Sequence, residues 1–398
     1  MRWKNKGHEL DDIGARIASF SKVAIFCAGT KGIELLNVVH AHTNLEVVAF
    51  IDNDPKKQGS IVEGISVFSP SKWFNVPKKD TVMVVTVHNK DLQRVIIRQL
   101  EDDYGLKYNY DIFITHKFIP LYMWYKNEKL IAFNTIYSIT QYCNLKCKNC
   151  NSFMQYIQNP KHMEVNKIKT DINLLFSTFD YMFILNLFGG ETTLHPDLSE
   201  IIRYIHTNYK NRYDFLGIAT NGFTKLSYEL VDAIKSTNVV VNISNYAQYF
   251  PHDDERQKQF ATFLQCLKDN KITHYVEGFS SYWFDYGFET VDRITASEEI
   301  LQTVFDKCNM HCRLMQDGKY YNCAYDKLAL NIGVHSQDSG FDLQNFDPKD
   351  KVSLLEYSLG YNTKGYVELC KICDGSGSQT RVTPAIQTER KPFPKRLE

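Results

Sequence analysis

The sequence predicts an α/β protein built on parallel sheets, followed by a smaller cysteine-rich region. Apolar runs of strand length alternate with amphipathic helical patterns over roughly the first three quarters of the chain, which is typical of strands joined by crossover helices. Five of the ten cysteines lie after residue 300. Since 398 residues are too many for one ordinary core, we expect three domains, over residues 1–125, 126–297 and 298–398.

The first region predicts a β-α-β unit. An apolar strand, Lys22–Cys27, leads through the turn Ala28–Gly32 into a helix, and a second strand, Leu45–Asp52, ends in an acid about twenty residues later. A further strand over Thr81–Val87 and a helix over Asp91–Glu101 continue the alternation. These elements indicate a parallel sheet with a glycine-containing turn at its edge.

The second region predicts a longer parallel sheet, open or curled into a partial barrel. Its strand candidates are Phe133–Ile139, Tyr181–Phe188, Phe215–Thr220, Val239–Ser244 and His274–Phe279. Helical patterns separate them at Lys167–Phe179, Asp197–Tyr209, Ser227–Ser236 and Asp254–Asp269. Ligands of such sheets bind at the carboxyl ends of the strands.

Four polar motifs follow the first four of these strands, so we expect them at one edge of the sheet. In chain order they are Cys143-x3-Cys147-x2-Cys150, Gly189-Gly190-Glu191, Thr220-Asn221-Gly222 and Ser244-Asn245.

The composition argues against several classes of protein. Lys+Arg and Asp+Glu both number 46, so the formal net charge is zero and no nucleic-acid partner is expected. No apolar run approaches the ~20 residues of a membrane span, and the N-terminus lacks a signal peptide, so we expect a cytoplasmic protein. In that compartment thiols stay reduced, which favours metal or cluster ligation over disulfides.

The three cysteines at residues 143, 147 and 150 lack a nearby fourth ligand. A closed structural metal site uses four protein ligands, so a site with three keeps one coordination position open. The alternatives are a zinc knuckle or free thiols. Zinc sites usually add a second ligand pair nearby, and none follows at such spacing before Met163.

Together with Gly189-Gly190-Glu191, the triad resembles the radical S-adenosylmethionine (radical SAM) enzymes. The resemblance implies a [4Fe-4S] cluster on Cys143, Cys147 and Cys150, whose open iron binds SAM. It also implies that the glycine pair and Glu191 contact the SAM amino group. As an alternative, the glycines at 189–190 and at 222 can simply form turns that bind no ligand.

The same resemblance places further SAM contacts at Thr220, Asn221, Ser244 and Asn245. The family commonly has an aromatic residue before the third cysteine, where this chain has Asn149, so Tyr142 or Phe153 is expected to contact adenine instead.

The late cysteines resemble the Twitch (shortened SPASM) auxiliary-cluster domain. The pattern runs from Cys308 or Cys312 through Gly318 and Cys323 to Cys370-x2-Cys373, and implies a second [4Fe-4S] cluster ligated fully by protein, with a structural zinc site as the alternative. Gly318 predicts a hairpin that returns Cys323 towards Cys308. Cys308 and Cys312 compete for the first position, and the spare thiol is a candidate hydrogen donor to a substrate radical. The polar tail after Gly375 is expected to be a loosely packed extension.

The first region resembles the Rossmann-like domain of sugar-modifying enzymes in surface-glycan (polysaccharide) biosynthesis, over Phe50–Asp54 with Gly64-Ile65 and Ser69-Pro70 downstream. The turn supplies only two glycines of the dinucleotide fingerprint. Either Gly29, Gly32 and Asp52 hold a nucleotide or nucleotide-sugar, or the domain is a docking module.

The family resemblances imply an N-terminal Rossmann-like sheet, a partial (β/α)6 barrel and an auxiliary-cluster domain. They imply reductive cleavage of SAM to a 5′-deoxyadenosyl radical, fed by a flavodoxin- or ferredoxin-type electron donor. We expect a sugar, nucleotide-sugar or glycan substrate that is oxidised, epimerised or dehydrated. The alternatives are a peptide- or protein-modifying maturase and a non-catalytic iron–sulfur scaffold or electron carrier.

Overall fold

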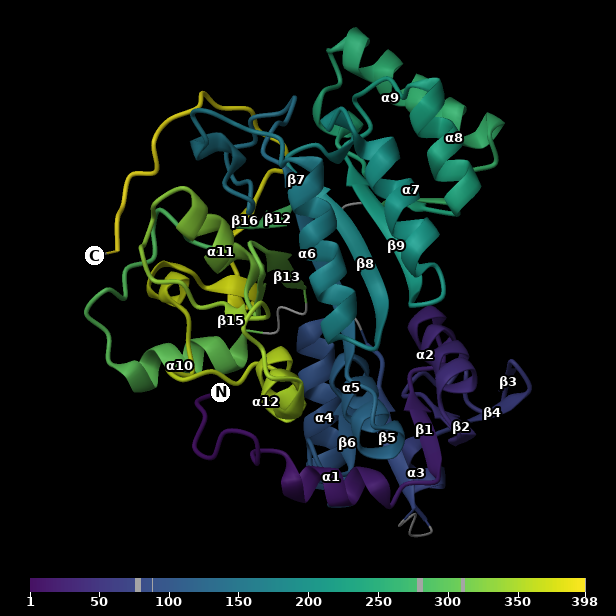
Figure 1. Cartoon of the computed structure of the whole chain (residues 1–398). Coiled ribbons are helices and arrows are strands. Elements are labelled where there is room, and N and C mark those ends of the chain that lie inside the picture. The colour runs from purple at the N-terminus through teal and green to yellow at the C-terminus, as the bar shows by residue number, and fades with distance from the viewer. Residues whose placement is uncertain (76–79, 88, 278–281, 309–311, 398) are drawn as a thin grey trace. The chain divides into compact units, whose positions relative to one another are not determined.

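A computed structural model of the chain describes residues 1–75, 80–87, 89–277, 282–308 and 312–397 (Figure 1). It divides into two compact units. One is Gly7–Ile131, and the other joins Met1–Lys6 to Ala132–Glu398. The central region and the cysteine-rich segment therefore share one compact unit, while the finer division of the chain at residues 125 and 297 stays a prediction.

The smaller unit contains a six-stranded sheet in the order β3-β4-β2-β1-β5-β6. All neighbours pair in parallel except β3 with β4. Leaving out β3, the order by sequence is 3-2-1-4-5, which is the order found in doubly wound nucleotide-binding folds. The strands are β1 (Lys22–Phe26), β2 (Glu46–Ile51), β3 (Ile61–Val62), β4 (Ile65–Phe68), β5 (Thr81–Val85) and β6 (Ile112–Ile114).

Helices flank these strands, as the sequence pattern predicts, and the central strands β1 and β5 are almost wholly buried because apolar residues occupy both of their faces. The helices are α1 (Asp11–Ala18), α2 (Thr30–His42), α3 (Pro70–Trp73), α4 (Lys90–Tyr104) and α5 (Thr115–Asn127).

The larger unit contains an eight-stranded sheet in the order β11-β10-β9-β8-β7-β13-β14-β15. Strands β8 to β11 pair in parallel, and β13 pairs in parallel with β7. The predicted strands lie in this sheet, although Phe279, the predicted end of the last one, falls outside the described residues. The strands are β7 (Ile131–Thr140), β8 (Tyr181–Gly189), β9 (Tyr213–Thr220), β10 (Val240–Ser244), β11 (His274–Glu277), β13 (Arg313–Gln316), β14 (Lys319–Tyr321) and β15 (Phe341–Asp342).

Helices follow the strands of this sheet and bury their apolar faces against it (Figure 1). These are α6 (Val165–Thr178), α7 (Leu198–Tyr209) and α8 (Tyr228–Thr237). The unit also contains α9 (Asp254–Asp269), α10 (Glu298–Lys307), α11 (Ala324–Asn331) and α12 (Lys351–Ser358). A small separate sheet pairs β12 (Trp283–Phe284) with β16 (Arg381–Val382).

The cysteine-rich segment extends the central sheet through the β13–β14 hairpin. Asp317 and Gly318 form its two-residue turn with φ of 56° and 73°, so the hairpin predicted at Gly318 is confirmed. The buried carboxylate of Asp171 on α6, only 2% exposed, accepts the turn's N–H groups at 3.0 and 2.9 Å and the Tyr137 hydroxyl at 2.7 Å. One side chain thus ties α6 and β7 to the hairpin.

The polar tail is not the loosely packed extension that its composition predicts. Ala385 and Leu397 are buried, and the Leu397 N–H donates to the Val334 carbonyl at 2.7 Å. Figure 1 shows the tail beyond β16 next to the loops that follow β7. Backbone pairing at a few points holds a segment that lacks a periodic apolar pattern.

None of the helices in the described part of the chain is both long enough and apolar enough to cross a membrane.

We predict that Asp171→Asn loosens the β13–β14 hairpin, because an amide replaces one acceptor oxygen and leaves a buried N–H without a partner. The expected cost is about 2 kcal/mol, seen as faster hydrogen exchange in peptides covering residues 313–321. Asp232→Asn is the control, since this carboxylate is 71% exposed and pairs with Arg203 at the surface. Equal exchange in the two variants would contradict the role given to Asp171.

Candidate active site

The cysteine triad lies in the loop after β7. Cys147 is 7% exposed, and burial raises its pKa to about 12. The backbone N–H of Leu145 donates to Cys143 Sγ at 3.4 Å, and backbone N–H groups of Met154 and Ser152 bond to Cys150. These donors favour thiolates, while burial disfavours them. Iron ligation would resolve this conflict by supplying the positive charge.

The glycine pair lets the end of β8 approach the end of β7. A Cβ on Gly189 would lie 2.3 Å from the Thr140 carbonyl oxygen, and one on Gly190 would lie 2.2 Å from the Tyr142 carbonyl oxygen. The approach is fixed by hydrogen bonds from the Gly190 N–H to Thr140 at 2.9 Å and from the Glu191 N–H to Tyr142 at 2.7 Å. Any side chain at either glycine would push the two strand ends apart.

Glu191 joins the ends of β8 and β9. Its carboxylate, 1% exposed, accepts the Thr220 hydroxyl and the Asn221 N–H, both at 2.7 Å, and both the N–H and the hydroxyl of Thr193. Burial raises the pKa of Glu191, and these donors oppose that effect. The predicted SAM-binding carboxylate therefore already has four protein donors.

Asn144 links the cysteine loop to the next strand end. Its side-chain N–H donates to the Phe223 carbonyl at 2.8 Å, and its amide oxygen accepts from Asn221 at 2.7 Å. The cysteine loop, the glycine pair and the Thr220–Gly222 turn thus form one hydrogen-bonded group at the same edge of the sheet, as their positions after successive strands predict.

The fourth strand end brings Tyr246 to the triad. Its hydroxyl bonds to Ser244, and its charge would interact with those of all three cysteines of the triad. Burial raises the pKa of the Tyr246 hydroxyl, so this side chain is uncharged near the cysteines. The Asn245 side chain instead caps the next turn by accepting the Ala247 N–H at 3.2 Å. Only its place directly after Ser244-Asn245 could have marked Tyr246 in the sequence.

The two aromatic residues expected at adenine differ in accessibility. Tyr142 is 40% exposed, and its ring stacks on His162 with centroids 4.4 Å apart. Phe153 is fully buried and stacks on Phe288 at 4.5 Å. Because Phe153 is enclosed in a hydrophobic cluster, Tyr142 is the better placed of the two.

Four of the five late cysteines gather around one point. Charges on Cys308, Cys323 and Cys370 all raise the pKa of Cys373, after burial as the main cause. A Cβ on Gly375 would lie 2.7 Å from Cys308 Sγ and 4.0 Å from Cys373 Sγ, and the Gly375 N–H donates to Cys373 Sγ at 3.1 Å. The group therefore includes Cys308.

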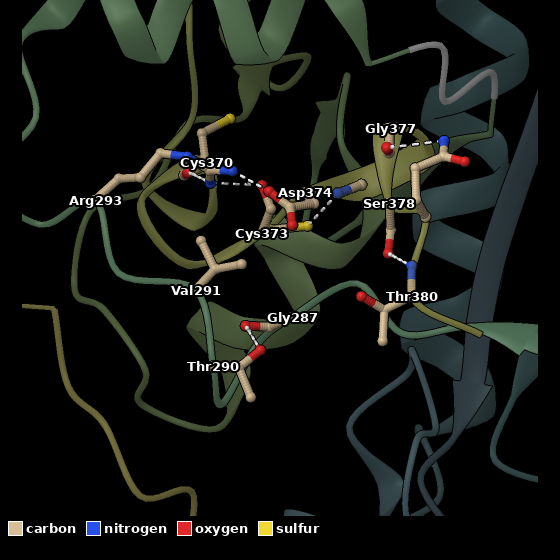
Figure 2. Close-up of polar contacts among 12 residues, drawn as sticks. Gly287, Thr290, Val291, Arg293, Cys370, Cys373, Asp374, Gly377, Ser378 and Thr380 are labelled. Atoms are coloured by element: carbon tan, nitrogen blue, oxygen red, sulfur yellow. Dashed lines mark hydrogen bonds and ion pairs between the residues drawn. The ribbon is translucent and has the colours of Figure 1, made fainter. Parts of the chain in front are cut away.

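Arg293 holds the loop between Cys370 and Cys373. Its guanidinium donates to the carbonyl oxygens of both cysteines at 3.2 Å and pairs with the carboxylate of Asp374 (Figure 2). Nothing in the sequence marks this arginine, because it lies nearly eighty residues before the loop it binds.

Cys312 makes contacts of its own with the central sheet. Its Sγ accepts from the Asn134 amide at 3.5 Å, and the side chain packs against Ile136, Leu314 and Tyr321. Its charge would nevertheless raise the pKa of Tyr325, which also neighbours Cys323. Cys312 thus neighbours both the sheet and the late cysteines, and which thiol is the spare one stays a prediction.

The donor sets fit iron–sulfur clusters. Among the described residues no three His, Cys, Asp or Glu side chains stand close enough to share one metal ion. In a cluster each thiolate binds a different iron, so its sulfurs stand farther apart than the ligands of a single ion. Three thiols in one loop and four in the second group match one open and one closed cluster.

In the smaller unit, a glycine is required at Gly32 in the first turn of α2, because a Cβ there would lie 2.1 Å from the Cys27 carbonyl oxygen just after β1. Gly29 begins α2 with open space around it within the described residues. Asp52, predicted to bind a nucleotide, accepts the N–H groups of Ala28 and Asp54 at 2.9 Å and the Lys57 ammonium at 3.0 Å. Asp52 therefore shapes its own loop whatever it binds.

Comparison with known proteins identifies the central region. The model of the radical SAM superfamily matches residues 137–266, and a model described as C2185-like, N-terminal, matches residues 19–104. The antilisterial bacteriocin subtilosin biosynthesis protein AlbA of Bacillus subtilis (strain 168) is 26% identical over 153 residues, which cover 37% of this chain and 31% of AlbA. The match thus spans about a third of that relative's length.

Solved structures resemble the chain at low sequence identity. BtrN in complex with AdoMet and 2-DOIA has a TM-score of 0.38 at 14% identity, over 65% of this chain and 99% of BtrN. Streptococcus suis SuiB bound to precursor peptide SuiA has a TM-score of 0.37 at 12% sequence identity, and the match covers 71% of this chain and 83% of SuiB. UDP-D-quinovosamine 4-dehydrogenase from Vibrio fischeri is 28% identical over 21% of this chain and 73% of that one, with a TM-score of 0.19.

The central region is a radical SAM domain, as the cysteine triad predicts. Residues 137–266 thus belong to the radical SAM superfamily, whose cofactors are a [4Fe-4S] cluster and SAM.

We predict that Cys308→Ala lowers the iron content of the anaerobically reconstituted protein and that Cys312→Ala does not. Two [4Fe-4S] clusters bring about eight iron atoms per chain, and loss of one leaves about four. Iron and sulfide analysis measures the difference, with Cys266→Ala on α9 as a control that keeps all of the iron. Iron loss on substituting Cys312 instead of Cys308 would contradict the assignment.

We predict that Asp52→Asn destabilises the smaller unit at neutral pH by about 1–3 kcal/mol, because it removes an acceptor from a buried loop. Burial alone would raise the pKa of Asp52, but its three donors outweigh burial and lower it. The stabilisation is present above the ordinary pKa of 3.8 and is lost as the pH falls through the lower folded value.

Hydrogen exchange in peptides covering β1 and β2 measures this effect between pH 3 and 7. The control is Asp91→Asn, whose carboxylate is 73% exposed. We expect the difference in stability between Asp52→Asn and the unchanged protein to shrink as the pH falls. A difference that stays constant down to pH 3 would contradict the role given to the Asp52 carboxylate.

Proposed function

We propose that the protein cleaves SAM reductively at the Cys143–Cys150 loop and uses the resulting 5′-deoxyadenosyl radical to abstract a hydrogen atom from an organic substrate. The observation that carries this proposal is the hydrogen-bonded group of strand ends. It sets a loop with only three cysteine ligands beside the glycine pair, Thr220 and Asn221. When bound, the cluster and SAM supply one-electron cleavage chemistry.

The chain's own residues bind and orient SAM. Cys143, Cys147 and Cys150 would hold a [4Fe-4S] cluster, and three protein ligands would leave one iron open to the amino and carboxylate groups of SAM. Because Glu191 already has four donors, we assign it a positioning role and assign the ammonium contact to the backbone carbonyls of the glycine pair. Ser244 and Tyr142 are accessible for ribose and adenine contacts.

The auxiliary group has a separate role in the proposal. Cys308, Cys323, Cys370 and Cys373 hold a second [4Fe-4S] cluster, since their thiols are grouped by burial and by the loop that Arg293 braces. When bound, that cluster would supply one-electron exchange or stabilise the fold. A flavodoxin- or ferredoxin-type protein supplies the electron that starts the reaction.

The proposed substrate is a sugar, nucleotide-sugar or glycan, which undergoes oxidation, epimerisation or dehydration. Support comes from the smaller unit, whose parallel strand order and glycine turn are those of nucleotide-binding sheets. In this proposal the unit presents the substrate by its nucleotide.

A second candidate substrate is a peptide. The observation that favours it is the local similarity to AlbA, named for bacteriocin biosynthesis, over 153 residues. In that case the smaller unit would serve as the docking module for the peptide.

The test is anaerobic incubation of reconstituted protein with SAM and reductant. We expect 5′-deoxyadenosine from the unchanged protein and none from a variant with alanine at Cys143, Cys147 and Cys150. Deuterated nucleotide-sugars and deuterated peptides are then added in parallel, and deuterium in 5′-deoxyadenosine identifies the substrate class.

Transfer from peptides alone would replace the sugar proposal by the second candidate. A protein that binds iron but forms no 5′-deoxyadenosine would leave only an iron–sulfur scaffold or electron carrier.

A further inference from the structure

We propose that the C-terminal tail covers the cysteine triad and that Gln387 tunes the cluster there by donating an N–H to the Cys147 sulfur. In this role Gln387 is a positioning residue, and the tail is a fixed part of the active site. The inference rests on the proposed function, because it concerns the cluster that the triad would hold.

The tail and the triad loop pair as two antiparallel segments. Cys147 and Gln387 are directly opposite each other in this pairing. The Lys148 N–H donates to the Ile386 carbonyl at 2.7 Å, and the Thr388 N–H donates to the Lys146 carbonyl at 2.8 Å. The residues directly before and after Cys147 are therefore bound to a segment about 240 positions away in the chain.

The side chain of Gln387 is fixed in one orientation by this pairing. Its amide oxygen accepts the Lys146 N–H at 2.7 Å, so its NH2 group must face the other way. That group donates to Cys147 Sγ at 3.4 Å and to the Ala385 carbonyl at 2.7 Å. A backbone donor thus determines which end of the amide meets the sulfur.

The tail is anchored on the far side of the triad as well. The Lys391 N–H donates to the Gln155 carbonyl at 3.2 Å, and the Gln155 side chain donates to the Lys148 carbonyl at 3.1 Å. The ring of Phe393 packs edge-on against Tyr156 at 4.8 Å. The segment over Cys147 is therefore held at both ends.

An N–H donor at a ligating sulfur favours the reduced cluster. Reduction adds negative charge that the sulfurs share, and a hydrogen bond to one of them stabilises that charge. Cys147 is buried, so this donor meets little competition from water. Gln387 is expected to raise the midpoint potential of the SAM-binding cluster, which makes its reduction easier.

The test is a redox titration followed by electron paramagnetic resonance of the reconstituted protein carrying Gln387→Leu. We expect the ratio of reduced to oxidised SAM-binding cluster at a fixed potential to fall about tenfold, which is about 59 mV for one electron. Gln387→Glu keeps the acceptor for Lys146 but removes the donor and adds charge, so we expect a shift at least as large. SAM addition identifies the cluster, and the auxiliary cluster serves as an internal reference.

The matched control is Gln379→Leu in the same tail, where the amide donates to the Gly377 carbonyl rather than to a sulfur. It should leave the midpoint unchanged. A midpoint in Gln387→Leu equal to that of the control would overturn the tuning role.

The pairing itself is judged on iron-free protein by hydrogen exchange, independently of any cluster. Slow exchange of the Lys148 and Thr388 N–H groups supports the pairing of the tail with the triad loop. Exchange at the rate of an unstructured peptide overturns it. A protein without a SAM-responsive cluster would overturn the proposed function and the tuning role together, and the hydrogen-exchange result would still decide the pairing.

Discussion

The buried carboxylate of Glu191 is the interaction on which the candidate active site depends. It takes four hydrogen bonds from two strand ends, and burial makes each of them costly to lose. Through Asn221 the same group extends to Asn144 in the cysteine loop. Thiols that must hold a cluster with one open iron need a rigid frame, because a shift of one strand end would displace the glycine pair from the triad. Glu191 provides that frame.

A second buried carboxylate, Asp171, ties the other cysteine group to the same sheet. It binds the turn between β13 and β14, and β13 pairs with β7, the strand that leads into the triad. The two cysteine groups are thus built on adjoining strands of one compact unit. In the proposed function, the auxiliary cluster would therefore have a fixed position relative to the first.

In the smaller unit, the acidic residue predicted to bind a nucleotide, Asp52, already forms hydrogen bonds within its own loop. Asp52 binds two backbone N–H groups and Lys57, and Gly32 is needed so that α2 can approach β1. Asp52 and Gly32 therefore each have a structural use of their own. A carboxylate with two oxygens can still accept a further donor, so the loop geometry is compatible with a ribose as well as with a docking role.

The local sequence determined the class of chemistry and the order of the elements. Cysteine spacing, glycine pairs and strand-end polar residues act within a few positions of one another, and apolar periodicity identified the strands and helices around them. Only the tertiary structure decided which distant residues meet. It grouped Cys308 with the other late cysteines, set Arg293 on the Cys370–Cys373 loop and placed Gln387 against Cys147. These contacts join residues about fifteen to 240 positions apart, and no local pattern encodes them, because each depends on how the whole sheet brings its loops together.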